Sequence, residues 1–504
     1  MVTTNYLFFC YIGTTIYNNV PILGFQKKLH FKKPHPVKKS LILLFLITGL
    51  SLVSCFEDQD DVLHPASTVE INDFIWRGLN YFYLYKTDTP ELADDAFATD
   101  ADYKAFLDSF ETPEAFFAYL KSAQDRFSIL VDDYVELENA LSGITLNNGM
   151  EYGLVYYPDD SNNVFGYVRY VLPNSDAASK GVQRGMVFNT IDGTQLNDQN
   201  FDTLLSPDSY TIGLASFDGT TIMATGDSIS LTKAQYTENP VFKTLVLNVG
   251  GHSIGYIMYN AFTSEFDSQL NTAFGQFKSM GITDLVVDLR YNGGGSVRSA
   301  TYLSSMITGQ FTGQVFYTEQ WNPDRQADYA EDGKFLSSFV SGGESINSLN
   351  LSKVYIITSS RTASASELVI NGLAPYIDVV QIGANTTGKY QASFLLYDAP
   401  APNFSRAQVN PNHRYAMLPL VFKTANAAGN TDYVDGLIPD IEQFEDYSNL
   451  GVLGNENEPL LATAIAAITG LPTPGIKKNT FHKTISERKA LVPGYQMMWV
   501  EKDE

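Results

Sequence analysis

Hydroxyl side chains gather where an apolar, strand-like run gives way to a helix-like run. The stretch SSRTASASELVINGLAPY spans residues 359–376 and includes Thr362, Ser364 and Ser366. A hydroxyl at a helix start can cap the free backbone N–H groups of the first turn. It can also act as a nucleophile, because the helix N-terminus stabilises the oxyanion that forms there. The stretch by itself leaves both roles open.

Two further stretches carry residues that could assist a nucleophile. VVDLRYNGGGS, residues 286–296, is a buried-strand pattern that ends in three glycines, and such a turn exposes backbone N–H groups. Phosphate binding is disfavoured here, because no Lys-Ser or Lys-Thr pair follows the glycines. IGANTTGKYQAS, residues 382–393, presents Lys389 after a strand-like run. Most lysines are solvated surface residues, so this stretch alone does not indicate a chemical role for Lys389. Such a role is indicated only when the other two stretches are considered with it.

Together the three stretches resemble the motifs of the carboxyl-terminal processing (tail-specific) proteases, a family of Ser–Lys peptidases. The T-A-S-A-S-E motif corresponds to residues 362–367 and the T-x-G-K motif to residues 386–389. The resemblance implies that Ser364 is the nucleophile and that Lys389, 25 positions later, is the general base. GLIPD, residues 436–440, is similar to a further family signature.

The resemblance also implies which groups assist the dyad. An oxyanion hole would use the backbone N–H groups of Gly294 and Ala365. Some family members orient the lysine with a Gln four positions after it. Here that position is Ser393, while Gln391 stands two positions after the lysine. Both would share the face of Lys389 in a strand, so the orienting residue stays open between them.

A lysine can act as a base only in its neutral form. Its reference pKa of ~10.4 must fall by roughly 3 for work near neutrality, and burial without a carboxylate partner would supply this. Glu367 is the nearest acidic residue in the sequence. This mechanism therefore requires Glu367 to direct its carboxylate away from the Lys389 ammonium.

Residues 150–235 have the texture of short strands and turns. The stretch YVLPNSDAASKGVQRGMVFNTIDGTQL is similar to the second half of a PDZ domain. That resemblance implies a loop whose backbone N–H groups hold the terminal carboxylate of a peptide. The loop would consist of Tyr152, Gly153, Leu154 and Val155. A β-rich domain without a ligand is the alternative.

The N-terminal region has the pattern of an export signal. KKPHPVKK at residues 32–39 is basic, and the next 15 residues, 40–54, are apolar, which is short for a membrane span. LVSC, which ends at Cys55, resembles a bacterial lipobox, so Cys55 is the predicted lipidation site. We expect an outer-membrane lipoprotein of the cell envelope. The acidic FEDQDD that follows is a weak signal for surface exposure.

The expected fold is multidomain α+β. It combines an N-terminal helical region, a PDZ-like β-rich domain and an α/β peptidase core of the ClpP/crotonase-like type. The expected parts are a signal peptide with an upstream extension (1–54), a lipidated tether (55–68), a helical region (69–145), a PDZ-like domain (146–238), a Ser–Lys peptidase core (239–470) and a C-terminal tail (471–504) that no pattern places.

Composition excludes several classes of function. The net charge of −23 disfavours nucleic acid and anionic membranes as partners, so only a lipid anchor would hold the chain at a membrane. Only two Cys are present, and the four His beyond the signal segment (His64, His252, His413 and His482) lack ligand spacing, so no metal site and no cofactor are expected.

The favoured function is a serine endopeptidase that acts on exported proteins or peptides and recognises their C-terminal ends. A Ser-His-Asp hydrolase using His252 or His413 is a rival, although no G-x-S-x-G motif is present. The second rival is a surface lipoprotein that binds peptides or glycans without turnover.

Overall fold

The computed structural model describes residues 65–159, 161–472 and 483–501. These residues all fall within the unit Leu63–Glu504. The predicted signal segment and Cys55 lie outside the described residues.

The N-terminal region is helical, as predicted. Ser67 and Glu70 form a capping box that starts α2, and α2 then buries Phe74, Ile75 and Leu79. The helices of this region are α2 (Thr68–Phe82), α3 (Asp100–Leu107), α4 (Pro113–Leu120) and α5 (Tyr134–Leu141), with short 3-10 turns at Lys86–Asp88 and Pro90–Leu92. A small sheet of β1 (Ile129–Val131), β20 (Ala416–Leu418) and β19 (Leu396–Tyr397) ties this region to later parts of the chain.

The β-rich segment forms an antiparallel sheet in the order β23-β3-β4-β5-β7-β8, with β6 paired to β5. Its strands are β3 (Met150–Tyr156), β4 (Val164–Val171), β5 (Val187–Ile191), β6 (Thr194–Gln195), β7 (Ser209–Phe217), β8 (Ile222–Thr232) and β23 (Thr484–Glu487). Two short helices, α6 (Asp176–Ser179) and α7 (Phe201–Leu205), accompany the sheet, and β2 (Ile144–Asn147) pairs with β9 (Ala234–Thr237) in a separate two-stranded sheet. Its edge strand β23 comes from the C-terminal tail.

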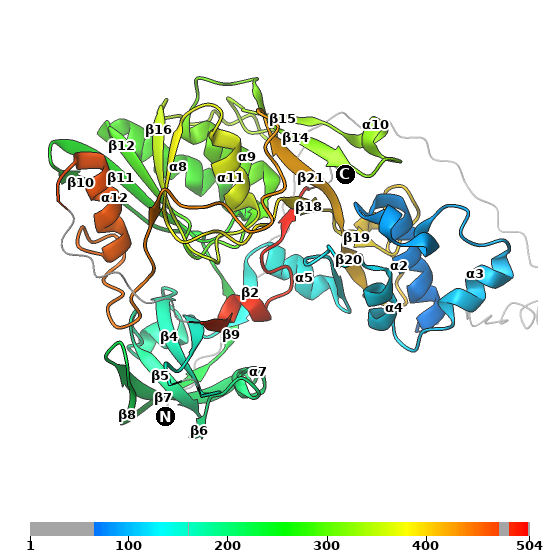
Figure 1. Cartoon of the computed structure of the whole chain (residues 1–504), viewed down its shortest axis with the longest axis horizontal. Helices are drawn as coiled ribbons and strands as arrows, with labels where there is room; N and C mark the ends of the chain where they lie inside the picture. The colour runs from blue at the N-terminus through cyan, green and yellow to red at the C-terminus, as the bar shows by residue number, and fades with distance from the viewer. Residues whose placement is uncertain (1–64, 160, 473–482, 502–504) are drawn as a thin grey trace, which may run out of the picture. The chain divides into compact units, whose positions relative to one another are not determined.

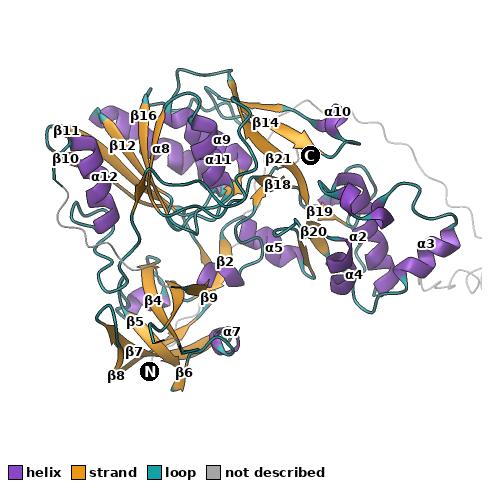
Figure 2. Ribbon diagram, in the orientation of Figure 1, coloured by secondary structure: helices purple, strands orange, loops and turns teal. Residues whose placement is uncertain are grey.

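The α/β core is built on a largely parallel sheet in the order β10-β11-β12-β16-β17-β22. Its strands are β10 (Val241–Val249), β11 (His252–Tyr259), β12 (Asp284–Asp288), β16 (Lys353–Thr358), β17 (Asp378–Gly383) and β22 (Ile441–Glu442). Val287 faces a cluster with α8 (Asp267–Met280), α9 (Val297–Ile307) and α11 (Ala365–Leu373), while Val286 faces α12 (Pro459–Thr469). Successive strand residues thus pack against different helices, and these helices flank the sheet in Figure 2.

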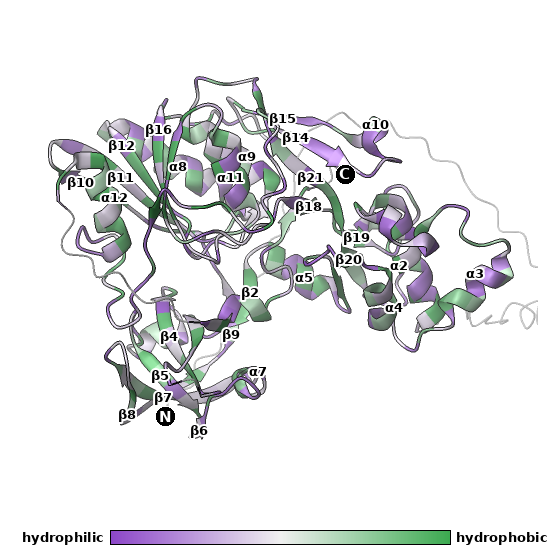
Figure 3. Ribbon diagram, in the orientation of Figure 1, coloured by the Kyte–Doolittle hydropathy of each residue, from purple (hydrophilic) through white to green (hydrophobic). Residues whose placement is uncertain are grey.

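Helix α8 is amphipathic, as its mixed colours in Figure 3 show, whereas every residue of α11 is buried. A second core sheet has the order β13-β24-β18-β21-β14-β15. Its strands are β13 (Gly295–Ser296), β24 (Met498–Trp499), β18 (Gln391–Ser393), β21 (Leu420–Asn426), β14 (Val315–Trp321) and β15 (Asp332–Lys334), with α10 (Gln326–Tyr329) between β14 and β15. This sheet joins the glycine-rich turn, the lysine segment and the C-terminal tail.

The predicted multidomain fold with mixed α and β structure is confirmed. The unplaced tail is the main addition, because its strands β23 and β24 join two different sheets (Figure 1, red). No helix among the described residues is long and apolar enough to cross a membrane.

Candidate active site

Ser364 lies between strand β16 and helix α11 in an unusual backbone conformation. Its φ of 64° and ψ of −116° are rare for a residue with a side chain, and such conformations cost ~1–3 kcal/mol. The surrounding loop holds this geometry, because Thr362 donates to the Leu289 carbonyl at 2.9 Å and Ser366 donates to the Asn292 carbonyl at 3.1 Å. Ser366 therefore has a structural partner, whereas the Ser364 hydroxyl faces Lys389.

Lys389 approaches Ser364 in a fully buried environment. Its Nζ lies 3.4 Å from Ser364 Oγ, and neither residue is exposed to solvent. Burial lowers the pKa of Lys389 from 10.5 to about 7, against the opposing charges of Asp125 and Glu367. The neutral form of the lysine, which can accept the serine proton, is therefore accessible near neutral pH.

Glu367 uses its carboxylate to hold the backbone around the dyad. One oxygen accepts from the N–H groups of Ser364 at 2.7 Å and Lys389 at 2.9 Å. The other oxygen accepts from Gly388 N–H at 2.7 Å and from the Thr386 hydroxyl. These donors fix the carboxylate between the two catalytic segments. Burial raises the pKa of Glu367 despite these hydrogen bonds.

The side chains predicted to orient Lys389 do not contact it. Gln391 donates its side-chain amide to Tyr85 at 2.9 Å, and the buried hydroxyl of Ser393 has no hydrogen-bond partner among the described residues. Instead, Lys389 Nζ donates to the backbone carbonyl of Gln391 at 2.8 Å. The expectation of an orienting side chain is therefore wrong, because the backbone carbonyl of Gln391 already accepts the hydrogen bond of the amine.

The predicted oxyanion-hole residues flank Ser364, but one of them is not free. A methyl group placed on Gly294 would lie 2.6 Å from the Cβ of Ser364, so only glycine permits this approach. The Gly294 N–H donates to the side-chain oxygen of Asn292 at 2.9 Å and is thus engaged within its own turn. Ala365 is the first residue of α11, where backbone N–H groups lack intrahelical partners.

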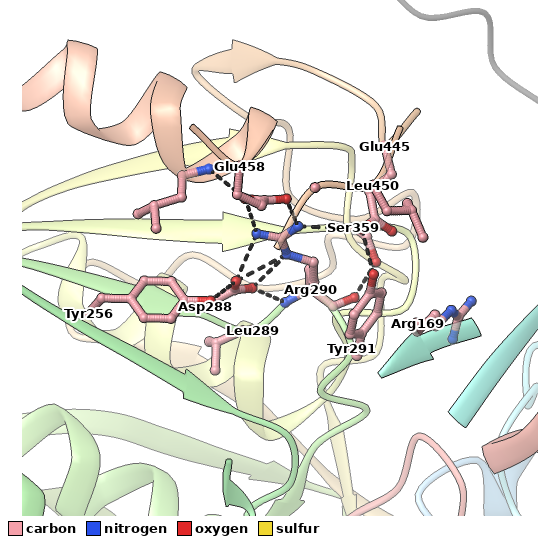
Figure 4. Close-up of polar contacts among 12 residues, drawn as sticks. Arg169, Tyr256, Asp288, Leu289, Arg290, Tyr291, Ser359, Glu445, Leu450 and Glu458 are labelled. Atoms are coloured by element: carbon pink, nitrogen blue, oxygen red, sulfur yellow. Dashed lines mark hydrogen bonds and ion pairs between the residues drawn. The ribbon is translucent and has the colours of Figure 1, made fainter. Parts of the chain in front are cut away.

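A buried ion network fixes the strand that leads into the glycine turn. Arg290 is fully buried between Asp288, at 2.8 Å, and Glu458, at 2.6 Å (Figure 4). Glu458 caps helix α12, and Tyr256 donates to Asp288 at 2.7 Å. Arg290, which precedes the glycine turn in VVDLRYNGGGS, therefore positions that turn and does not act as a substrate ligand.

The four residues predicted as a carboxylate-binding loop are part of a strand. Tyr152, Gly153, Leu154 and Val155 belong to β3, which pairs with β4 on one side and with β23 on the other. These partners occupy both edges of β3, so the predicted loop is wrong. The sequence pattern alone could not reveal that a tail segment more than 300 residues away occupies this edge.

Residues from the helical N-terminal region complete the lysine environment. Phe127 places its ring 5.4 Å from Lys389 Nζ, and Arg126 donates to the Gly388 carbonyl at 2.9 Å. The side chain of Asp125 accepts from the N–H of Phe127 at 2.9 Å and so folds this loop. Sequence reasoning missed all three residues, because they lie far from the catalytic motifs and match no catalytic pattern.

The histidines of the rival hydrolase hypothesis have other partners. His252 pairs with Asp284 at 2.8 Å where β11 and β12 begin, whereas the Ser364 loop follows the end of the parallel strand β16. His413 pairs with Asp398 at 3.0 Å and packs on Phe74. Among the described residues, no group of three or more potential ligands could hold a metal ion.

Comparison with known proteins relates this geometry to one peptidase family. Residues 253–398 match the peptidase family S41 model, and residues 70–129 match the model of the peptidase S41 N-terminal domain. A Picosynechococcus carboxyl-terminal-processing protease is 25% identical over 245 residues, which are 45% of this chain and 52% of that protein. A chloroplastic C-terminal processing peptidase of Tetradesmus obliquus is 24% identical over 43% of this chain and 46% of its own length.

The chain thus spans about half the length of these curated relatives. Among solved structures, a Bacteroides fragilis protein described as an S41 protease has a TM-score of 0.62 and 26% identity, over 79% of this chain and 97% of that one. The S41 match includes Ser364 and Lys389, and the N-terminal match includes Asp125 and Phe127. The chain therefore carries two domains of peptidase family S41, an S41 N-terminal domain at residues 70–129 and a peptidase S41 domain at residues 253–398.

Proposed function

We propose that this chain is a serine endopeptidase that cleaves exported protein or peptide substrates near their C-terminal ends. The observation that carries the proposal is the buried pair of Ser364 and Lys389, with 3.4 Å between Oγ and Nζ. The preference for C-terminal ends is transferred from the relatives described as carboxyl-terminal-processing proteases.

The proposed reaction uses Lys389 as the proton carrier throughout. Neutral Lys389 takes the proton of Ser364 as Oγ attacks the peptide carbonyl, and the oxyanion forms beside the N-terminus of α11. The lysine then gives that proton to the leaving amine, which yields an acyl-enzyme and the released C-terminal fragment. A water molecule, deprotonated by Lys389, attacks the acyl carbon, and Ser364 recovers its proton from the lysine.

The experiment that tests this proposal is labelling with a fluorophosphonate probe, together with hydrolysis of a denatured protein substrate. Ser364→Ala should abolish both signals and retain the wild-type circular dichroism spectrum. Ser352→Ala, at an exposed position, is the matched control and should leave both unchanged. Labelling that persists in Ser364→Ala would reject the nucleophile, with Ser366 as the next candidate. If the wild-type chain neither reacts nor cleaves even with an excess of polypeptide substrate, it is a binding protein without turnover.

We further propose that the antiparallel sheet around β3 acts as a PDZ-like peptide-binding domain and that Cys55 carries a lipid anchor. The first proposal rests on the edge of β3 that the tail strand β23 occupies, because this pairing shows that the edge accepts an extended chain. The second rests on the basic, apolar and LVSC pattern before Cys55. The expected location is the outer membrane, and the acidic FEDQDD stretch after Cys55 favours exposure at the cell surface.

A further inference from the structure

The C-terminal tail crosses the catalytic site as a β-strand. Strand β24 lies between β13, which follows the glycine turn, and β18, which follows Lys389. Met498 is in register with Gly295, and Trp499 is in register with Ser393. The Val500 N–H donates to the Ser393 carbonyl at 3.1 Å. The tail therefore occupies the gap that separates the two halves of the active site.

The tail also closes the space directly above the nucleophile. A methyl group placed on Gly294 would lie 2.6 Å from Ser364 Cβ and 3.0 Å from the carbonyl oxygen of Met497. A peptide carbonyl of the tail thus borders the same small space as the serine. Gln496 donates to the Thr387 hydroxyl of the lysine loop at 2.9 Å. Since Ser364 is fully buried, a substrate cannot reach it while the tail stays in place.

The other end of the tail extends the antiparallel sheet. Strand β23 pairs with the edge of β3, with Glu487 opposite Gly153 and Ser486 opposite Leu154. Addition of a strand to a sheet edge is a general mode of peptide recognition, in which the backbone provides affinity and the side chains provide specificity. The same tail thus contacts the peptide-accepting edge and the catalytic site.

Three consecutive tail residues each meet a group of opposite charge. Glu487 pairs with Arg169 of β4 and, at 3.4 Å, with Arg361 of the serine loop. Arg488 pairs with Glu151 of β3. Next to it, Lys489 pairs with Glu238 at 3.3 Å. An acidic residue followed by two basic residues therefore matches the receiving surface position by position.

The pairing of Glu487 also neutralises a larger buried cluster. That cluster joins four arginines and four carboxylates, namely Arg169, Arg184, Arg290, Arg361, Asp288, Glu445, Glu458 and Glu487. Without the tail, one positive charge would remain uncompensated, and Arg361 and Arg169 would face each other without their shared carboxylate. A buried uncompensated charge is strongly unfavourable, so this place favours an incoming carboxylate.

We infer that the tail, residues 484–501, is a peptide ligand bound in cis, and that an extended polypeptide with a carboxylate for Arg169 and Arg361 must displace it to reach Ser364. This inference rests on the proposed peptidase function and adds its regulation and a recognition site. The engaged N–H of Gly294 agrees with it, because the site is closed in a conformation whose oxyanion hole is incomplete. The tail thus keeps the chain latent until a competing polypeptide binds.

The first experiment measures activity in full-length variants with a weakened tail. Glu487→Gln removes the negative charge that pairs with Arg169 and Arg361. Val500→Pro removes the backbone N–H that donates to the Ser393 carbonyl. Glu487→Gln should raise the rates of probe labelling and protein hydrolysis by about tenfold, the change expected in an equilibrium that loses one charged hydrogen bond, and Val500→Pro, which removes a neutral hydrogen bond, should raise them by roughly fivefold. Glu456→Gln, at an exposed position, is the matched control. Unchanged or reduced rates in both tail variants, with the fold intact, would overturn the inference.

The second experiment does not depend on catalysis. A fluorescent peptide with the sequence of residues 483–501 is titrated, by anisotropy, into Ser364→Ala and into Ser364→Ala with Glu487→Gln. The weakened tail competes less well, so the peptide should bind the double variant about tenfold more tightly. A peptide with Gln at the position of Glu487 should bind it more weakly. Equal affinities of the two variants for the peptide, or no binding to either, would contradict occupancy of the site by the tail. Peptide binding without hydrolysis in the wild type would reject only the peptidase function.

Discussion

Replacement of Lys389 by Met should reveal the stability that the chain gives up to keep a neutral lysine at its catalytic site. The pKa of Lys389 falls from 10.5 to about 7 because the amine is buried. Below pH 7 the lysine is protonated in both the folded and the unfolded chain, so the whole unfavourable burial of its charge destabilises the fold. At ~1.4 kcal/mol per tenfold change in proton affinity, this amounts to roughly 5 kcal/mol.

The destabilisation should fade as the pH rises. Between pH 7 and 10.5 the unfolded chain binds more protons at this residue than the folded chain does, so the free energy of unfolding rises with pH. Above 10.5 the lysine is neutral in both states and the contribution vanishes. The stability advantage of Lys389→Met should therefore be smaller at pH 9.5 than at pH 6, by roughly 3 kcal/mol.

Urea unfolding of the wild type and of Lys389→Met at these two pH values measures the difference. Comparison of the two proteins cancels the other titrating groups, and the loss of the hydrogen bond to the Gln391 carbonyl adds a term that does not depend on pH. Lys389→Arg should be inactive, because a guanidinium does not deprotonate. If the stability advantage of the methionine variant over the wild type stays constant between pH 6 and 9.5, Lys389 is charged in the folded chain and cannot be the base.

Three further changes test other features of the chain. Asp125→Asn removes a charge that raises the pKa of Lys389, so the rise of kcat/KM with pH should move to lower pH, and a move to higher pH would contradict this role. Ser364→Gly should be more stable than Ser364→Ala by about 1 kcal/mol in urea unfolding, because glycine adopts the positive φ of 64° without strain; equal stability would show that the backbone relaxes. Cys55→Ser should leave the membrane fraction in cell fractionation, and retention there would exclude lipidation at Cys55.

The parts of the fold that depend on local sequence pattern could be predicted. The apolar runs that became β12 and β16 and the helix that starts after Ser364 are encoded by periodicity and by a helix start signal. The proximity of Ser364 and Lys389 was also predictable, because both residues lie in motifs whose spacing matches that of the resembled family. These features need only short stretches of sequence.

Pairings across long stretches of chain could not be predicted in the same way. Strand β24 contains two residues, and its partners Gly295 and Ser393 lie about 200 and 100 positions earlier. No periodicity can develop in so short a strand, and its register depends on a sheet formed by other segments. The role of the Gln391 carbonyl was hidden for a related reason, since a backbone group leaves no mark on residue type.

Glu367 explains how a buried carboxylate can stand beside a lysine that must stay neutral. A free carboxylate within contact distance would hold the ammonium charged and raise its pKa. The oxygens of Glu367 instead accept from three backbone N–H groups and one hydroxyl, all from the segments that carry Ser364 and Lys389. Its charge still opposes the effect of burial on Lys389, but burial is the larger effect. The same carboxylate thus fixes the geometry of the dyad while its lone pairs remain committed to the backbone.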